Sequence, residues 1–125
     1  MEKYLYEDLT KKIIECCYSV YDELGSGFLE SVYENALILE LKDKCLKVEQ
    51  QKELEIFYKG NIVGNFRTDI IVNNKVILEL KSVSDISKIH EVQLVNYLKG
   101  TNMKVGLVIN FGEKLTFKRK FFDRH

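Results

Sequence analysis

The spacing of the apolar residues changes at Val48, and this change constrains the fold more than any other feature of the chain. Before it, apolar residues recur at steps of three and four from Leu5 to Leu24 and from Leu29 to about Cys45. This is the spacing of amphipathic helices. Two helices are therefore predicted, with Gly25 ending the first and Ser26-Gly27 forming the turn between them.

The chain then continues in three β-type segments separated by turn residues: Val48–Tyr58, Ile62–Val72 and Lys75–Val83. Gly60 and the Asn73-Asn74 pair lie between these segments. Gly and Asn accept the positive φ angles that tight hairpins require. The pattern predicts an antiparallel meander of three strands.

One more helix and two more strands complete the predicted order, over Asp85–Lys99, Lys104–Phe111 and Leu115–Phe122. Ser84 or Asp85 is expected to cap the start of the helix, and Gly100 to end it. The first of the two strands is almost entirely apolar, which indicates burial on both faces. The order ααβββαββ predicts an α/β (α+β) domain in which helices cover a mixed sheet.

Length and composition agree with one globular domain spanning residues 1–125. Apolar residues make up 46% of the chain and charged residues 30%, which excludes a disordered chain. No apolar run approaches the ~20 residues of a membrane span, and the first residues lack the apolar core of a signal peptide. We therefore expect a cytoplasmic protein with no membrane partner. Cys16, Cys17 and Cys45 form no CxxC pair, so neither a disulfide framework nor a structural zinc site is expected.

Two acids stand where the pattern of the strands calls for apolar residues. Glu79 interrupts the apolar run Val76–Leu80, and Lys81 follows on the same face of the strand. Asp69 is the one acid of the preceding segment, Ile62–Val72. An acid that faces the interior needs a compensating partner. Two carboxylates beside an ammonium group form a pocket suited to Mg²⁺ or Mn²⁺.

This arrangement depends on the turn between the two strands. A two-residue turn at Asn73-Asn74 would pair Asp69 with Leu78 and place Asp69 and Glu79 on opposite faces of the sheet. A loop of odd length, or a β-bulge near Asp69, would place them on the same face. We expect one of these two features, and a separation below ~8 Å, because both carboxylates must reach one cation.

Asp69 followed by Glu79-Leu80-Lys81 resembles the D…(D/E)xK core of the PD-(D/E)XK nuclease superfamily. The segment Gly27–Tyr33 resembles the GxxExxY signature of one small bacterial family within it. The similarity extends through three further segments: Tyr33–Leu37, Gln93–Leu98 and Asn110–Gly112. The resemblance implies a restriction-endonuclease-like fold and metal-dependent hydrolysis of phosphodiester bonds.

The resemblance also implies roles for individual residues. Asp69 and Glu79 would hold the metal, with the backbone carbonyl of Leu80 as a further ligand. Glu30 would bind the metal directly or through water. Lys81 would position water or stabilise the charge of the phosphate, because two neighbouring carboxylates favour its charged form.

Gln93 and Tyr97 lie one helical turn apart and resemble a QxxxY motif that supports the site or the nucleic-acid strand in exonuclease-type branches. A polar helix edge is the alternative interpretation of this pair. Alternatives also remain for Glu30, which could be an acid favoured at a helix start. Glu79 and Lys81 could form an ordinary ion pair.

Three other side chains near these motifs have plainer interpretations. Tyr33 is expected to pack in the core, and Glu34 is expected to be solvated. His90 is interpreted as a solvated or supporting histidine rather than as a phosphate contact.

Basic and aromatic residues alternate near the carboxyl end of the chain, among them Lys118 and Lys120. They could follow a nucleic-acid backbone and stack on bases, or form an edge strand with lysines outside and phenylalanines inside. The expected partner is nucleic acid, DNA rather than RNA. The small surface of the domain favours a homodimer or a larger protein partner. The alternative function is a non-catalytic nucleic-acid-binding or protein-interaction module that retains the nuclease fold.

Overall fold

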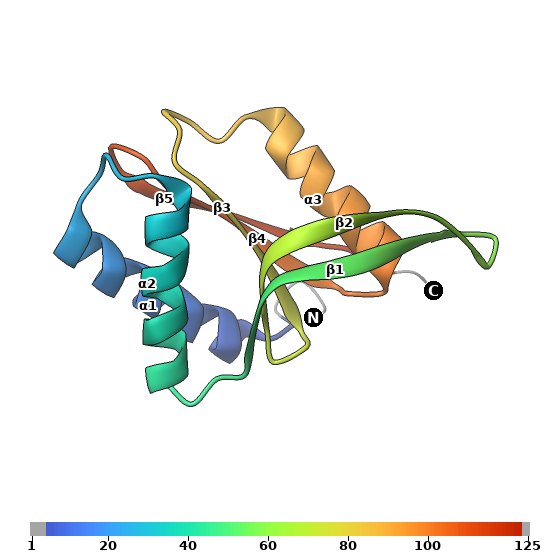
Figure 1. Ribbon diagram of the computed structural model, residues 1–125, viewed down its shortest axis with the longest axis horizontal. Coiled ribbons are helices and arrows are strands. Elements are labelled where there is room, and N and C mark those ends of the chain that lie inside the picture. Colours follow the sequence, from blue (N-terminus) through green and yellow to red (C-terminus); the bar gives the residue numbers. More distant parts are fainter. Residues whose placement is uncertain (1–4, 124–125) are drawn as a thin grey trace.

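The computed structural model describes residues 5–123 and contains three helices and five strands (Figure 1). Their bounds are α1 Glu7–Leu24, α2 Glu30–Asp43, β1 Val48–Tyr58, β2 Asn61–Val72, β3 Val76–Lys81, α3 Lys88–Thr101, β4 Val105–Phe111 and β5 Leu115–Phe121. This order confirms the predicted ααβββαββ arrangement. The first four residues, on which the signal-peptide prediction rests, lie outside the described part of the chain.

The strands form one mixed sheet in the order β1-β2-β3-β4-β5. The pairs β1/β2 and β2/β3 are antiparallel, as the meander predicted. Strand β4 runs parallel to β3 because α3 crosses between them, and β5 returns antiparallel to β4. The architecture is consistent with the restriction-endonuclease-like fold.

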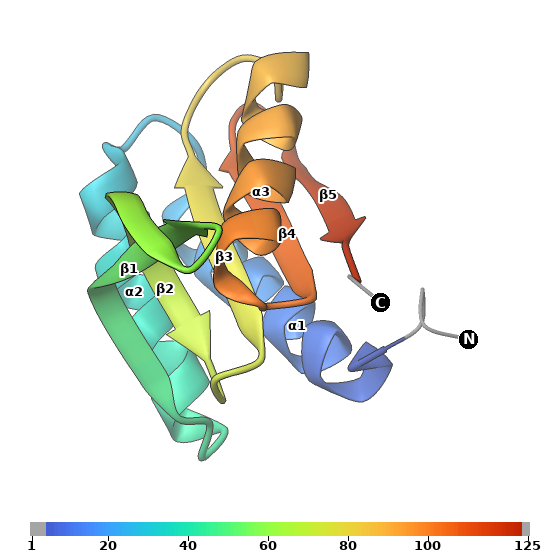
Figure 2. The ribbon, with the colours of Figure 1, turned by 90° about the vertical axis from the view of Figure 1, so that its right-hand side faces the viewer.

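Helices cover both faces of the sheet, with α1 and α2 on one side and α3 on the other (Figure 2). A large apolar core joins α1 and α2 to the sheet. A smaller one lies beneath α3 and is made by Ile71, Ile77, Leu94, Leu98 and Val108. Every residue of β4 is buried, as its apolar sequence predicted. Within residues 5–123, no helix combines the length and the apolar character needed to cross a membrane.

Cys16 and Cys17 are fully buried in α1, as their place in the apolar stripe of the helix predicted. Burial raises the pKa of both thiols, so they behave as small core side chains rather than as nucleophiles. Cys45 is exposed, and all three cysteines are free thiols.

The predicted ends of α3 were wrong. The helix begins at Lys88, with Ser87 as its N-cap, and the His90 Nδ1 accepts a hydrogen bond from the Ser87 N–H at 3.2 Å. Gly100 lies inside the helix, which ends at Thr101 and is followed by Asn102 as its left-handed C-cap. A Cβ at Gly100 would lie 3.0 Å from the Ile56 Cγ2 of β1, closer than an ordinary van der Waals contact. The glycine therefore marks a close approach between β1 and α3.

Candidate functional site

The turn between β2 and β3 brings Asp69 and Glu79 together. Val72 pairs with Val76, and Ile70 pairs with Leu78, so the loop between the strands contains three residues, 73–75. The odd-length loop that convergence required is therefore present. Continuing the same register beyond the last pair places Asp69 opposite Glu79, on the same face of the sheet.

The side chains of this pair take over the hydrogen bonding where the β2/β3 ladder stops. The Leu80 N–H donates to Asp69 Oδ2 at 2.7 Å, and the Asp69 N–H lies 3.4 Å from Glu79 Oε2. Each acid thus reaches across to the other strand. The Asp69 backbone and the Glu79 carboxylate are thus in direct contact, inside the ~8 Å separation expected for a shared cation.

A polar cavity of about 280 Å³ surrounds the pair. Its walls come from the start of α2, from β2 and β3, and from α3, and the lining residues are Glu30, Arg67, Asp69, Glu79, Lys81, His90, Gln93, Leu94 and Tyr97. The six side chains that the sequence assigned to the site gather here: Glu30, Asp69, Glu79, Lys81, Gln93 and Tyr97. The side chain of Leu80 is buried in the apolar core on the opposite face, while its backbone N–H contacts Asp69.

The cavity changes the protonation of Glu79. Burial, followed by the negative charge of Asp69, raises the pKa of Glu79 to about 8, and the ammonium of Lys81 offsets only part of this shift. In the metal-free protein, Glu79 therefore tends to keep its proton at neutral pH. A divalent cation would compensate the charge of both acids, and adjacent carboxylate oxygens are the donors that Mg²⁺ and Mn²⁺ prefer. The donor set fits such an ion.

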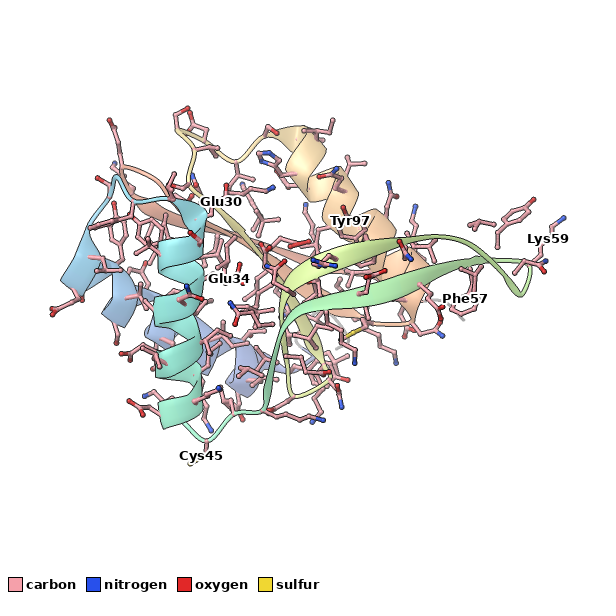
Figure 3. All side chains as sticks on the ribbon, viewed as in Figure 1. Glu30, Glu34, Cys45, Phe57, Lys59 and Tyr97 are labelled. Carbon is pink, nitrogen blue, oxygen red and sulfur yellow. The ribbon has the colours of Figure 1, made fainter. Side chains whose placement is uncertain are left out.

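Glu30 stands at the first residue of α2 and contributes to the wall of the cavity (Figure 3). It does not complete a cluster with Asp69 and Glu79: among residues 5–123, no three His, Cys, Asp or Glu side chains are placed to hold one metal ion. A carboxylate in this place can act through water, one of the two modes that the sequence resemblance implied.

Tyr33 fixes the loop that leads to Glu30. Its hydroxyl donates to the Gly25 carbonyl at 2.6 Å and accepts from the Phe28 N–H at 3.2 Å. Ser82, directly after β3, donates to the Phe28 carbonyl at 3.0 Å. Tyr33 is fully buried, so the core-packing interpretation is confirmed, and its hydroxyl adds a second task. The hydrogen bonds of the Gly27–Tyr33 segment thus connect the start of α2 to the end of β3.

The Asn110–Gly112 segment holds the loop between β3 and α3. The Asn110 side chain accepts from the Val83 N–H at 3.0 Å and donates to the Val83 carbonyl at 2.9 Å. A Cβ at Gly112 would lie 2.5 Å from the same carbonyl, so only glycine fits without a shift of the backbone. These contacts fix the chain as it leaves β3 for α3.

The prediction that Glu34 is solvated was wrong, because the side chain is buried. Glu34 lies on α2, one helical turn after Glu30 (Figure 3). Its side chain is 7% exposed and accepts hydrogen bonds from two consecutive side chains of β1. These are from Gln50 Nε2 at 2.7 Å and from Gln51 Nε2 at 2.9 Å. Gln51 Nε2 also lies 3.4 Å from Asp69 Oδ1. Sequence reasoning missed both glutamines, and their adjacent amides in one strand were the available signal.

The α3 side of the cavity is held by aromatic stacking. The Tyr97 ring stacks on Phe66 of β2, with ring centroids 3.7 Å apart and planes 8° apart. Burial, then the negative charges of Glu79 and Asp69, raises the pKa of Tyr97, so its hydroxyl keeps its proton. His90 also lines the cavity, and its role in the helix cap agrees with a supporting histidine. Arg67 adds a positive charge that sequence reasoning did not single out.

Lys118 and Lys120 lie on β5 and are not among the residues that line this cavity. Lys120 forms an ion pair of 2.6 Å with Glu91, and its hydrogen bond lowers the pKa of Glu91. Phe117 and Phe121 alternate with the lysines and pack against the large core. The arrangement agrees with the edge-strand interpretation of this segment.

The chain is similar to a known protein family in its sequence and to a solved structure in its fold. A family model described as the PD-(D/E)XK nuclease superfamily matches residues 7–121. No curated protein matches the chain. Among solved structures, the crystal structure of SSO0001 is similar, with a TM-score of 0.58 and 22% sequence identity over 96% of this chain. This chain covers 61% of that one, and the likeness concerns the fold.

Proposed function

Since the chain belongs to the PD-(D/E)XK nuclease superfamily, we propose that it hydrolyses phosphodiester bonds of nucleic acid with Mg²⁺ or Mn²⁺. The observation that carries the proposal is the contact between Asp69 and Glu79 beside Lys81 in one polar cavity. We further assign the chain to the GxxExxY family, because the Tyr33 hydroxyl bonds the turn before α2 at Gly25 and Phe28, and Glu30 lines this cavity.

Asp69 and Glu79 would hold the cation, with the Leu80 carbonyl as a further ligand and Glu30 acting directly or through water. When bound, the cation supplies activation of water and neutralises charge at the scissile phosphate. The Leu80 N–H donates a hydrogen bond of 2.7 Å to the Asp69 carboxylate and orients it. Glu79 must release its proton to serve as a full carboxylate ligand, so its raised pKa makes cation binding and proton release linked events.

Lys81 follows Glu79 by two residues on β3 and lines the same cavity. Its three N–H donors position the attacking water or stabilise the charge that develops on the phosphate. Arg67 offers a second cationic contact on the β2 side.

Gln93 and Tyr97 present polar groups from α3 to the same cavity and would steady the nucleic-acid strand. We expect DNA rather than RNA as the substrate. A domain of this size covers little of a duplex, so a homodimer or a larger protein partner would extend the contact, with Lys118 and Lys120 as additional phosphate contacts.

Cleavage assays test the proposal directly. Single- and double-stranded DNA and RNA are incubated with the protein and Mn²⁺, alongside the Asp69→Ala and Lys81→Ala variants. We expect cleavage by the wild type and its loss in both variants. Binding without cleavage under every condition would instead support the non-catalytic nucleic-acid-binding module.

A further inference from the structure

We propose that Gln51 is a positioning residue that holds the Asp69 carboxylate in the orientation needed to bind the cation. The inference rests on the proposed metal-dependent function and adds to it a residue outside the D…(D/E)xK pattern. Gln51 belongs to β1, which contributes no residue to the lining of the cavity.

Both oxygens of the Asp69 carboxylate have a donor. Oδ2 accepts from the Leu80 N–H at 2.7 Å, and Oδ1 lies 3.4 Å from Gln51 Nε2. The first contact fixes the position of one oxygen, and the second limits rotation of the carboxylate around it. Two donors from two different strands thus define the plane of the acid.

Glu34 determines which end of the Gln51 amide faces Asp69. Both Glu34 oxygens lie near Gln51 Nε2, at 3.1 and 2.9 Å. An ionised carboxylate only accepts hydrogen bonds, so it selects the NH₂ group of the amide. Since that group carries two protons, it can bridge Glu34 and Asp69. The amide thereby separates two acids that would otherwise repel each other.

The backbone of β1 is distorted at this residue. Gln51 has a φ of 52°, in the left-handed region that costs energy for a residue with a side chain. Consecutive residues of a regular strand point to opposite faces, yet the amides of Gln50 and Gln51 both reach Glu34. The strained conformation therefore brings the Gln51 amide to the side where Asp69 lies.

Three variants separate the role of the amide from that of the backbone. Gln51→Ala and Gln51→Gly both remove the amide, but only glycine relieves the left-handed strain. Gln50→Ala is the matched control, because Gln50 donates to Glu34 at 2.7 Å and to Asn35 at 3.0 Å rather than to Asp69. The Mn²⁺ dissociation constant is measured for each by titrating the melting temperature, with no nucleic acid present.

We expect Mn²⁺ to bind about 10-fold more weakly to both Gln51 variants, the low end of the range for residues that orient metal ligands. Gln51→Gly should melt at a higher temperature than Gln51→Ala and bind Mn²⁺ equally weakly. Gln50→Ala should lose stability while its Mn²⁺ affinity stays within about twofold of the wild type. Equal affinities in the Gln51 variants and the wild type would overturn the proposal.

Crystal structures of the metal-free variants provide a readout that needs no cation. The Asp69 carboxylate should rotate away from its wild-type orientation in Gln51→Ala and keep it in Gln50→Ala. An unchanged Asp69 in Gln51→Ala would refute the positioning role, whether or not the wild type binds Mn²⁺. Absence of Mn²⁺ binding by the wild type would overturn the proposed function, and the orientation of Asp69 would still decide the role of Gln51.

Discussion

The two faces of strand β3 do different work, although they alternate residue by residue along one short segment. Val76, Leu78 and Leu80 point into the large core beneath α1 and α2. On the other face, Ile77 packs beneath α3, while Glu79 and Lys81 line the polar cavity. The comparison teaches that the domain places most of its apolar burial on one face, which leaves the other free to carry charged groups that cost stability.

The largest expected effect is on catalysis, from a change on the polar face alone. Replacement of Lys81 by Ala should lower the cleavage rate about 100-fold or more, because it removes a cation aimed at the phosphate. The melting temperature should change little. Lys11→Ala, which removes an exposed lysine of α1, is the charge-matched control and should cleave normally. Equal activity of Lys81→Ala and Lys11→Ala would contradict the assigned role.

A change on the apolar face should have the opposite signature. Leu78→Ala removes a fully buried side chain and should lower the free energy of unfolding by about 3 kcal/mol. Leu39→Ala removes an equal side chain that is 68% exposed on α2 and should cost less than about 0.5 kcal/mol. Urea unfolding measures both. A similar cost for the two variants would show that the α1/α2 face does not dominate stability.

The polar face should also make stability depend on pH. The folded state raises the pKa of Glu79 from 4.5 to about 8, so it holds this proton more tightly than the unfolded chain does. The stabilisation is complete below pH 4.5 and is lost as the pH rises to about 8. The melting temperature of the metal-free protein should therefore fall as the pH rises from 4.5 to about 8. Glu79→Gln should flatten that part of the profile, and an identical slope in the variant would exclude Glu79 as its source.

A smaller effect is expected in the loop before α2, which leads to Glu30 at the polar cavity. Tyr33→Phe keeps the ring that stacks on Phe111 and removes the hydroxyl that bonds the loop before α2. The free energy of unfolding should fall by about 1 kcal/mol. Hydrogen exchange of the Phe28 amide should accelerate in the variant, because that N–H loses its acceptor. Unchanged exchange would show that the hydroxyl does not hold the loop.

The smallest effect is expected at the surface ion pair of α3 and β5. Lys120→Ala removes the 2.6 Å contact with Glu91, and the urea midpoint of unfolding should shift only slightly. Urea unfolding at low and high salt provides the measurement. A shift of the urea midpoint as large as that of Leu78→Ala would mean that the α3 face contributes more to stability than its small core indicates.

The fold could be predicted from the sequence wherever local pattern and packing agree. The apolar spacing located α1 and α2, and the unbroken apolar run located β4. The ends of α3 were missed because they depend on contacts that local sequence does not reveal. The His90 ring caps the first turn, and Gly100 serves a close approach to Ile56 instead of ending the helix.

The candidate site divides in the same way. Asp69 and Glu79 were predictable because each interrupts an apolar strand, and the geometry of the turn determined whether they could meet. Glu34 was misassigned because an acid on α2 has no visible reason for burial until β1 brings two amides to it. The role of Gln51 depends on its left-handed backbone conformation within a strand. The neighbouring residues in the sequence do not predict that conformation.

A crystal soaked in Mn²⁺ tests the central claim most directly. Anomalous scattering locates manganese independently of any assumption about its ligands. We predict a peak between the carboxylates of Asp69 and Glu79 in the wild type and no peak there in Asp69→Ala. A wild-type crystal without that peak, at a Mn²⁺ concentration that supports cleavage in solution, would contradict it.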